Sequence, residues 1–594
     1  MDQHNGKNLF ITTPKHETWR LIRIAHIFLL LTLTLRVYAA EPAPTLVLTG
    51  VKGQAAENIK LSVDPGRYQC TDSEWQFTYL KKKAKKQVRK ALQALGYYQS
   101  EIDLSIKRDE QCWALVMNVQ TGDRVIVREA HVEVRGELAD LPAYRNFAKK
   151  LPLQSGKLLN HDDYKKTKSE IEVLAARYGF FTGKFTEHRL DIDVKNNRAF
   201  ATLIFESGPR SNFGEIKIDQ STYDEQFIEH YITLKTGTPY DSQALIKQQQ
   251  ILNGSGYFST VEVAADREHF QNNKILVEIK LEPIKKHAYR FGLGASTDIG
   301  PRVSFNYKNR RVNRSGHEFS FDSRFSSVRS ELTVDYGIPQ GKAGADRLDF
   351  QAGYLIEDTD TSEHESYKLA ALQTRISESG WVRTAFLEYL YEDFSIADLS
   401  RKSELLMPGI RLKKTIADNT IFPRKGWRLD TSARIASEDL LSSTNLLQLS
   451  ASSKLIYPFG KSRLLGRVDL GASEVDDFEK LPASLRFFAG GDGSVRGFDY
   501  KSLGPVNEQG EIIGGKNLLT GSLEYEYPVR EKWGLAVFVD SGNAFNNFND
   551  YELFTGVGIG LRWHSPIGPI RLDLAQDVEQ ERSPRLHLSM GLDL

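Results

Sequence analysis

The chain has 594 residues, enough for about four domains of ordinary size. Its 78 Lys and Arg residues balance 77 Asp and Glu residues, and the resulting net charge of +1 argues against a nucleic-acid partner or a strongly acidic ligand. The mean hydropathy of −0.41 is typical of a soluble protein. It does not exclude a membrane barrel, because each spanning strand presents only every second residue to lipid.

An apolar run lies near the N-terminus, from Ile24 to Leu35, and follows several basic residues. Small residues come after it, at the positions that a signal peptidase reads, with Ala39 as the last of them. A short apolar run between basic and small residues is typical of a secretory signal peptide. We therefore predict a signal peptide over residues 1–39 and export of the remainder; an uncleaved membrane anchor is the alternative.

The chain contains two cysteines, Cys70 and Cys112. Export would place them in an oxidising compartment, where disulfides form and persist. We predict that the two residues are bridged, and two buried free thiols are the alternative.

The first half of the chain contains a threefold repeat. In each copy a short strand and a helical stretch lead to a Gly-aromatic turn, and two strands follow. These turns contain Gly96, Gly179 and Gly256, so the repeat recurs about every 80 residues, which indicates repeated modules. We predict three small α+β domains with the order β-α-α-β-β. Their ranges are 44–122, 123–208 and 209–285.

The strands of these modules alternate in polarity. In the second module Leu190, Ile192 and Val194 alternate with charged residues, as expected for strands with one buried face. Exposed edges of such small sheets could bind peptides by strand addition. A role as simple spacers is the alternative.

The segment 287–594 shows period-two alternation without helical periodicity. Leu535, Val537 and Val539, for example, fall on one face of a strand, and Phe538 and Asp540 fall on the other. Divided among sixteen strands, the segment provides about 19 residues for each strand and its connection, which is enough to cross a bilayer. A soluble sandwich would alternate too, but sixteen strands behind an export signal favour a 16-stranded antiparallel outer-membrane β-barrel.

A glycine-rich segment, residues 485–500, interrupts the barrel pattern and carries Arg496. Arginine can bind carboxylates through two parallel hydrogen bonds and can stack on aromatic rings. We predict that this loop enters the lumen; an extracellular loop with solvated charges is the alternative. The predicted lid-loop residues are Gly490, Gly491, Val495, Arg496, Gly497 and Phe498. Their predicted partners are Glu524, Phe538, Asp540 and Gly542.

Five motifs of the second half resemble the superfamily of outer-membrane protein assembly barrels. They are DNTIFPRKGWRLD (418–430), VRGF (495–498), GSLEYEYPV (521–529), FVDSG (538–542) and GVGIGLRWHSPIGPIRLDLA (556–575). The amino-terminal modules resemble the POTRA domains of that superfamily. Three such domains before a barrel of this length resemble the translocation and assembly module branch, the TamA-like proteins.

The resemblance implies an assembly factor that helps to insert or secrete β-barrel clients such as autotransporters. The implied partners are a TamB-like inner-membrane-anchored protein, unfolded outer-membrane clients and outer-membrane lipid, with the POTRA domains in the periplasm. The implied mechanism is a weak lateral seam between a first strand at 290–298 and a last strand at 585–594. The predicted seam residues are Phe291, Gly292, Leu293, Gly294, Ser589, Gly591, Leu592 and Leu594. Glycines that merely relieve wall curvature are the alternative.

The sequence does not favour an enzyme. It contains no Gly-x-Ser-x-Gly elbow, no HExxH and no paired His or Cys ligand spacing, so we expect no catalytic residues, no metal and no cofactor. A two-partner secretion transporter and a BamA-like general insertase are alternatives within the same superfamily. A passive outer-membrane pore or receptor is the alternative from another class.

Overall fold

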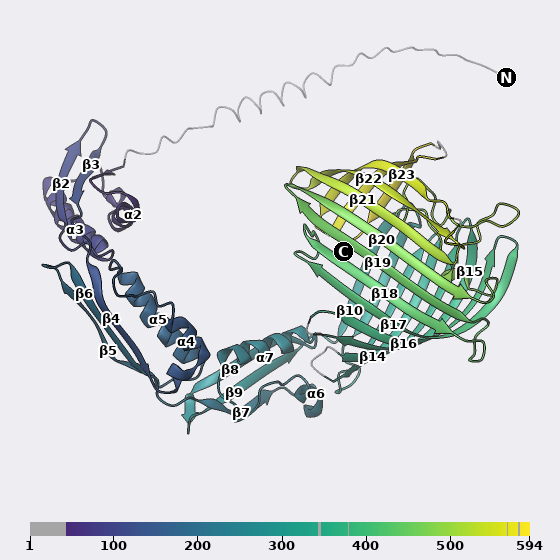
Figure 1. The fold of residues 1–594 in the computed structure, drawn as a ribbon, viewed down its shortest axis with the longest axis horizontal. Helices are drawn as coiled ribbons and strands as arrows, with labels where there is room; N and C mark the ends of the chain where they lie inside the picture. The colour runs from purple at the N-terminus through teal and green to yellow at the C-terminus, as the bar shows by residue number, and fades with distance from the viewer. Residues whose placement is uncertain (1–42, 342–345, 378, 550, 567, 580–582) are drawn as a thin grey trace, which may run out of the picture. The chain divides into compact units, whose positions relative to one another are not determined.

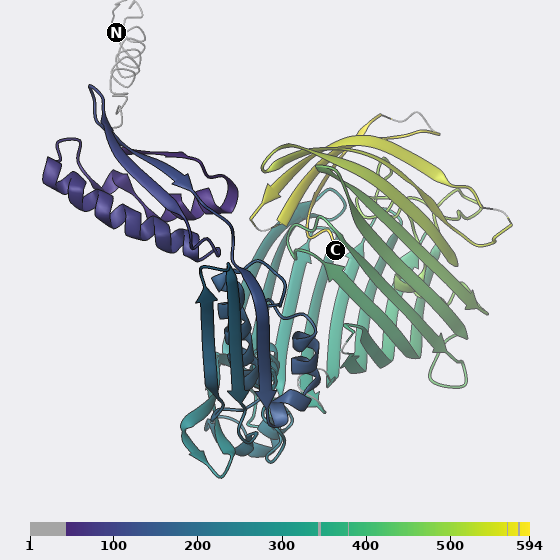
Figure 2. The same ribbon diagram turned by 60° about the vertical axis from the view of Figure 1, so that its left-hand side comes forward.

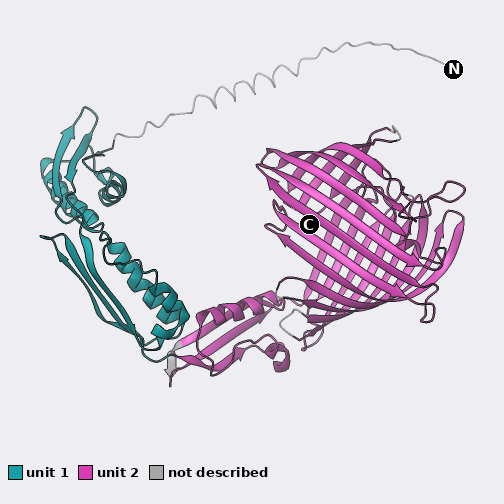
Figure 3. Ribbon diagram, in the orientation of Figure 1, with its two compact units in different colours: residues 1–210 teal, residues 211–594 magenta. Residues whose placement is uncertain are grey.

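The computed structural model describes residues 43–341, 346–377, 379–549, 551–566, 568–579 and 583–594. The predicted signal peptide, residues 1–39, lies outside the described residues. The chain divides into two compact units, with the boundary between Arg210 and Ser211 (Figure 3). Each unit is described by itself.

The first module folds in the order β-α-α-β-β. Its elements are β1 (Thr45–Thr49), α2 (Gly53–Ser62), the short helix η1 (Pro65–Arg67), α3 (Glu74–Gln93), β2 (Glu101–Arg108) and β3 (Trp113–Gln120). The last strand lies in the centre of the sheet, because the order is β1-β3-β2, with β1 parallel and β2 antiparallel to β3.

Helix α3 shows why this sequence folds locally as it does. A capping box between Ser73 and Gln76 satisfies free backbone N–H groups at its start. Phe77, Leu80 and Ala84 then return on one buried face at the spacing of a helix. The predicted Gly-aromatic turn follows the helix, and Gly96 adopts a φ of +89°, which glycine favours.

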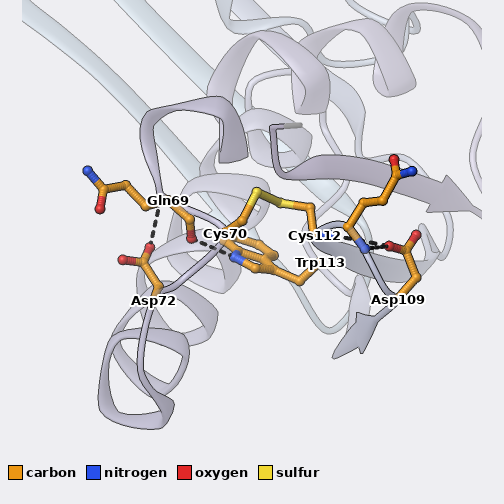
Figure 4. Close-up of a disulfide and its surroundings, with 7 residues drawn as sticks. Gln69, Cys70, Asp72, Asp109, Cys112 and Trp113 are labelled. Atoms are coloured by element: carbon orange, nitrogen blue, oxygen red, sulfur yellow. Dashed lines mark hydrogen bonds between the residues drawn. A yellow bond between two sulfur atoms is a disulfide. The ribbon is translucent and has the colours of Figure 1, made fainter. Parts of the chain in front are cut away.

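A disulfide joins Cys70, which lies between η1 and α3, to Cys112, which immediately precedes β3 (Figure 4). The buried ring of Trp113 lies beside it, and its Nε1–H donates to the Gln69 carbonyl at 2.9 Å. The covalent bond therefore anchors the α2–α3 connection to the central strand of the sheet.

The second and third modules repeat the same order. The second contains β4 (Ile126–Arg135), η2 (Glu137–Asp140), α4 (Pro142–Ala148), α5 (His161–Arg177), β5 (Lys184–Asp193) and β6 (Arg198–Glu206). The third contains β7 (Asn212–Asp219), α6 (Glu225–Glu229), α7 (Ser242–Gly254), β8 (Phe258–Gln271) and β9 (Lys274–Pro283). In both, the last strand is again central, and the other two strands form the edges of the sheet. Helices α4 and α5 lie along the sheet of the second module (Figure 2).

The second unit continues into one sheet of sixteen strands, each antiparallel to its sequence neighbour, which curves into a barrel (Figure 1). The first eight strands are β10 (His287–Ser296), β11 (Gly300–Asn309), β12 (Glu318–Ser326), β13 (Arg329–Gln340), β14 (Asp346–Asp358), β15 (Ser362–Ile376), β16 (Val382–Ile396) and β17 (Leu399–Ala417). The other eight are β18 (Gly426–Ala436), β19 (Leu446–Phe459), β20 (Ser462–Val475), β21 (Asn517–Arg530), β22 (Trp533–Phe545), β23 (Phe554–Ser565), β24 (Gly568–Asp577) and β25 (Arg585–Met590).

The barrel wall has an apolar outside and a polar inside. On β22 the side chains of Leu535, Val537 and Val539 are exposed on the outer face, whereas Phe538 and Asp540 are buried. This alternation is what hydrocarbon requires, because the strands must satisfy their backbone groups with one another and present apolar side chains to lipid. Among the described residues, no helix is both long enough and apolar enough to cross a membrane.

The third module contacts the β11–β12 turn of the barrel. Tyr257 Oη donates to the Gly316 carbonyl at 3.0 Å, and the Asp224 N–H donates to the Arg314 carbonyl at 3.0 Å. A side chain at Gly316 would overlap the Phe227 ring, so the absence of a side chain permits this close approach.

We predict that removal of the disulfide destabilises the first module selectively. Cys70→Ser with Cys112→Ser frees a loop with a sequence separation of 42 residues. The chain-entropy relation gives a loss of about 4 kcal/mol for such a loop. Hydrogen exchange on the full-length protein should show faster exchange in residues 44–122 and unchanged barrel strands. Dithiothreitol should reproduce this in the wild type and have no effect on the double variant; equal protection with and without the bond would contradict the prediction.

Candidate functional site: the lumen loop and the barrel seam

The long connection between β20 and β21 carries the glycine-rich segment and the short helix η3 (Ala483–Leu485). Gly490, Gly491 and Gly497 have φ values of +98°, +99° and +99°, a region that side chains disfavour. Val495 and Phe498 are fully buried and pack in one cluster with Ala489 and Leu503. The loop therefore has a small apolar core of its own and is not a solvent-exposed loop.

Arg496 projects from this loop into a ring of carboxylates. Its Nε and Nη2 donate to the two oxygens of Asp540 at 2.7 and 3.0 Å, a bidentate pair. Its Nη1 donates to Glu524 Oε2 and to Asp573 Oδ2, both at 2.9 Å. The guanidinium carbon also lies 3.3 Å from the centre of the Phe538 ring. The structure thus places Arg496 against both carboxylates and the aromatic ring named from the sequence.

Two members of this cluster are not among the residues predicted from the sequence. Asp573 of β24 accepts from Arg496, and Arg562 of β23 is fully buried and donates from Nε to Glu524 Oε1 at 2.9 Å. Arg562 Nη1 also pairs with Asp573. The sequence does contain a signal for both residues, because the period-two alternation places Arg562 and Asp573 on the lumen-facing side of their strands.

Two glycines of the wall let the loop and the strands approach. At Gly556 on β23 a Cβ atom would overlap the carbonyl oxygen of Arg496. At the predicted partner Gly542, a Cβ would lie 2.5 Å from the Leu519 carbonyl oxygen of the neighbouring strand. Gly556 is therefore the position at which the backbone of the loop rests directly on the wall.

The seam between β10 and β25 is the second part of the site. These strands end the sixteen-stranded sheet, and no β-ladder joins them within the described residues. The Thr297 N–H donates to the Leu588 carbonyl at 3.1 Å, and the Leu588 N–H donates to Thr297 Oγ1 at 3.2 Å. Arg302 Nη2 adds a contact of 3.4 Å to the Met590 carbonyl. The barrel is therefore nearly closed, with far fewer contacts at the seam than at any ladder.

The last strand is shorter than predicted. β25 ends at Met590, and Gly591, Leu592 and Leu594 lie beyond it. The reason is Asp593, which is buried and accepts from Arg463 Nη1 at 2.7 Å and pairs with Arg571. These ion pairs hold the end of the chain toward the lumen, so Leu592 and Leu594 do not extend the strand.

The predicted seam residues of β10 have two different environments. Phe291 and Leu293 expose 77% and 79% of their surface, more than most apolar side chains of the wall. A side chain at Gly292 would meet Ser304 Oγ, and one at Gly294 would meet the side chain of Arg302. Both of these neighbours belong to β11, so the glycines make room on the paired side of β10. Ser589 of β25 faces Arg571 in the β24–β25 register.

The lumen loop contacts both sides of the seam. Thr297 Oγ1 donates to Asp492 Oδ1 at 2.7 Å, and the Asp492 N–H donates to both oxygens of Asp298 at 3.1 and 2.9 Å. The Gly497 N–H donates to His587 Nε2 on β25 at 3.0 Å. Loop and seam therefore form one connected site.

Parts of this chain match known protein families. Residues 271–593 match the family model described as the Omp85 superfamily domain. The chain belongs to the Omp85 superfamily. Residues 45–121 match the first POTRA domain of TamA, and residues 211–283 match a POTRA model described as a surface antigen variable number repeat. The first and third amino-terminal modules thus match POTRA domains, and the second repeats their order of elements.

Individual relatives match this chain at low sequence identity. The outer membrane protein assembly factor BamA of Nitratidesulfovibrio vulgaris is 24% identical over 63% of this chain, and the match spans 50% of that relative. BamA of Neisseria meningitidis is 21% identical over 82% of this chain and 69% of the relative. The crystal structure of Haemophilus ducreyi BamA lacking POTRA domains 1–3 covers 79% of this chain and 99% of its own, with a TM-score of 0.67 and 16% identity. That likeness shows a shared fold.

We predict that Arg496→Ala destabilises the barrel by about 3–5 kcal/mol, the usual cost of removing one partner of a buried ion pair. The change leaves Asp540, Glu524 and Asp573 facing one another without the cation that they share. The measurement is the temperature at which the folded band is lost in a heat-modifiability gel. Arg530→Ala, at the exposed end of β21, is the control and should behave as wild type. A wild-type transition for Arg496→Ala would refute the assignment.

A second prediction tests the contact between the loop and β23 by a substitution that removes no charge. Gly556→Ala should displace the loop, because its methyl group would overlap the Arg496 carbonyl, and overpacking of this kind costs about 1–3 kcal/mol. Gly466→Ala on β20, where a Cβ has open space, is the matched control. Protease sensitivity of residues 485–500 should rise in the first variant alone. Equal sensitivity of the two variants would show that the loop does not rest on β23.

Proposed function

We propose that this chain is an outer-membrane assembly factor that receives client β-strands at the seam between β10 and β25. The observation that carries the proposal is the absence of a β-ladder between these two strands in the described chain. Every other pair of neighbouring strands in the barrel is joined by a ladder, for which hydrocarbon provides a strong reason: unpaired backbone groups there cost several kcal/mol each.

The two edges at the seam are suited to strand addition. An incoming client strand would supply the hydrogen bonds that β10 and β25 do not make with each other, which is the basis of recognition by β-augmentation. The exposed Phe291 and Leu293 would meet its outward side chains or lipid. The edge strands of the three POTRA sheets provide further positions for such pairing in the periplasm, with a spacer role as the alternative.

The lumen loop argues against the passive-pore alternative. A pore needs an open lumen, whereas here a long connection is held inside the barrel by buried ion pairs from β21, β22 and β24. An assembly factor has no such requirement, because its clients would leave sideways through the seam.

Within the superfamily we favour a TamA-like role, with a TamB-like inner-membrane-anchored partner and clients such as autotransporters. The match of residues 45–121 to the first POTRA domain of TamA supports it. The curated relatives named BamA favour the alternative of a general insertase. Depletion separates the two: loss of a TamA-like factor should reduce a subset of outer-membrane proteins, and loss of a general insertase should reduce all of them. Co-purification of a large inner-membrane-anchored protein would support the partner.

We predict that locking the seam stops client assembly. Thr297→Cys with Leu588→Cys joins the two positions that already share backbone contacts, in a background of Cys70→Ser and Cys112→Ser. Oxidation should block assembly of an autotransporter client in proteoliposomes, and reductant should restore it, because the bond prevents separation of β10 from β25.

The matched control keeps the same cysteine on β25. Leu572→Cys with Leu588→Cys links β24 to β25 at directly opposed positions, within a ladder that stays paired. Its oxidation should leave assembly unchanged. If the seam-locked and the ladder-locked proteins assemble the client at equal rates, lateral opening is not how this protein works.

A further inference from the structure

Three chemically active side chains from three elements meet at the seam. They are Asp298 in the β10–β11 turn, Asp492 in the lumen loop and His587 on β25, and one ligand atom from each lies within 4.8 Å of the others. Asp492 and His587 are separated by 95 residues in the sequence, so no ligand spacing could reveal the group. The expectation of no metal site rested on spacing motifs alone.

The imidazole of His587 orients Asp492. Its Nε2 accepts the Gly497 N–H, and its Nδ1 lies 2.6 Å from Asp492 Oδ1. A ring nitrogen that accepts a backbone N–H carries no proton, so Nδ1 carries the proton and donates to the carboxylate. With Thr297 Oγ1 donating as well, Asp492 Oδ1 is fully engaged, and the second oxygen is fixed in position.

That second oxygen, Asp492 Oδ2, is buried and has no hydrogen-bond partner in the described part of the chain. The Asp492 side chain exposes only 9% of its surface. The neighbouring Asp298 carboxylate accepts the Asp492 backbone N–H, and neither carboxylate forms an ion pair with a Lys or Arg of the described residues. Two close carboxylates without a cation repel each other, and a buried polar atom without a partner is costly.

An acidic cavity opens beside Asp298 and His587. Its volume is about 200 Å³, and its lining includes Asp298, Asp358 and Asp360. The nearby Asp499 is already paired with Arg585. Tyr500 also lines the cavity. The space is therefore polar, negatively charged and large enough for a cation with its remaining water molecules.

We propose that Asp298 and Asp492 bind a divalent cation of the oxygen-preferring class, Ca²⁺ or Mg²⁺, which ties the β10–β11 turn to the lumen loop at the barrel seam. Both ions use carboxylate oxygens, and both complete their coordination with water. His587 positions Asp492 and is not a ligand. With only two protein carboxylates, the affinity falls in the weak range of extracellular calcium modules, roughly 0.1–1 mM.

The test uses the full-length protein in phosphatidylcholine nanodiscs at pH 7.5, with Tb³⁺ as a luminescent oxygen-preferring probe. Tyr500 lines the cavity and should sensitise Tb³⁺ emission. Ca²⁺ and Mg²⁺ are then titrated as competitors, which distinguishes the two ions by their displacement midpoints. Asp298→Asn and Asp492→Asn are the test variants. Asp398→Asn, an exposed aspartate in the β16–β17 turn, is the matched control.

We expect saturable emission in wild type and in Asp398→Asn, and a loss of affinity of about tenfold or more in each test variant, as for removal of one of two charged ligands. Tyr500→Phe should abolish emission and keep the rise in unfolding temperature that millimolar Ca²⁺ gives in wild type. Superimposable titrations of Asp298→Asn and Asp398→Asn would overturn the proposal. So would a protein whose stability responds to acid but not to either cation, because the carboxylates would then share a proton. Asp298 lies in a turn outside the strands, so its variant remains informative if Asp492→Asn does not fold.

Discussion

The burial of one guanidinium group, that of Arg496, determines how the barrel interior is arranged. A cation taken out of water is costly unless its donors are satisfied by partners in good geometry. Here the partners come from three strands: Glu524 from β21, Asp540 from β22 and Asp573 from β24. Those strands must hold one register for the carboxylates to converge. The loop, in turn, must approach the wall closely enough that β23 has no side chain at Gly556.

The seam is governed by the need of backbone N–H and C=O groups for hydrogen-bond partners. A closed barrel has no edges, and this is how β-proteins normally avoid unwanted strand pairing. In this chain the last residues do not pair with β10, because Asp593 is held by Arg463 and Arg571 inside the barrel. The residues that could have lengthened β25 thus stabilise the lumen end of the chain. The ion pairs of Asp593 therefore limit how far β25 can extend along β10.

Much of the architecture could be predicted from the sequence because its signals are local. Period-two alternation around Val537 and Phe538 marks both faces of the wall, and the turn at Gly179 marks the end of a helix. The glycine-rich segment around Arg496 predicts the lumen loop, and the superfamily motifs support that prediction. The cluster at the seam could not be predicted, because Asp298, Asp492 and His587 are brought together only by barrel closure and by insertion of the loop. The end of β25 was also beyond local reasoning, since alternation continues through Leu592 while the distant Arg463 decides the path of the chain.

The contacts of the loop make the two edges of the seam unequal. Through Arg496 the loop is bound to β21, β22 and β24, all on the C-terminal side of the seam, and through Gly497 it contacts β25 itself. At the other edge of the seam its contacts are those of Asp492 with Thr297 and Asp298. Further from the seam the same connection is tied to β14 through the Lys501–Glu357 ion pair and to β16 through the Ser484 N–H, which donates to Glu392. Opening of the proposed seam would therefore leave the loop with β25 and break the contacts to the β10–β11 turn. The other contacts that opening would break are those of Leu588 with Thr297 and of Met590 with Arg302. A ligand that binds the closed arrangement at Asp298 and Asp492 would therefore oppose opening by its difference in affinity between the two states.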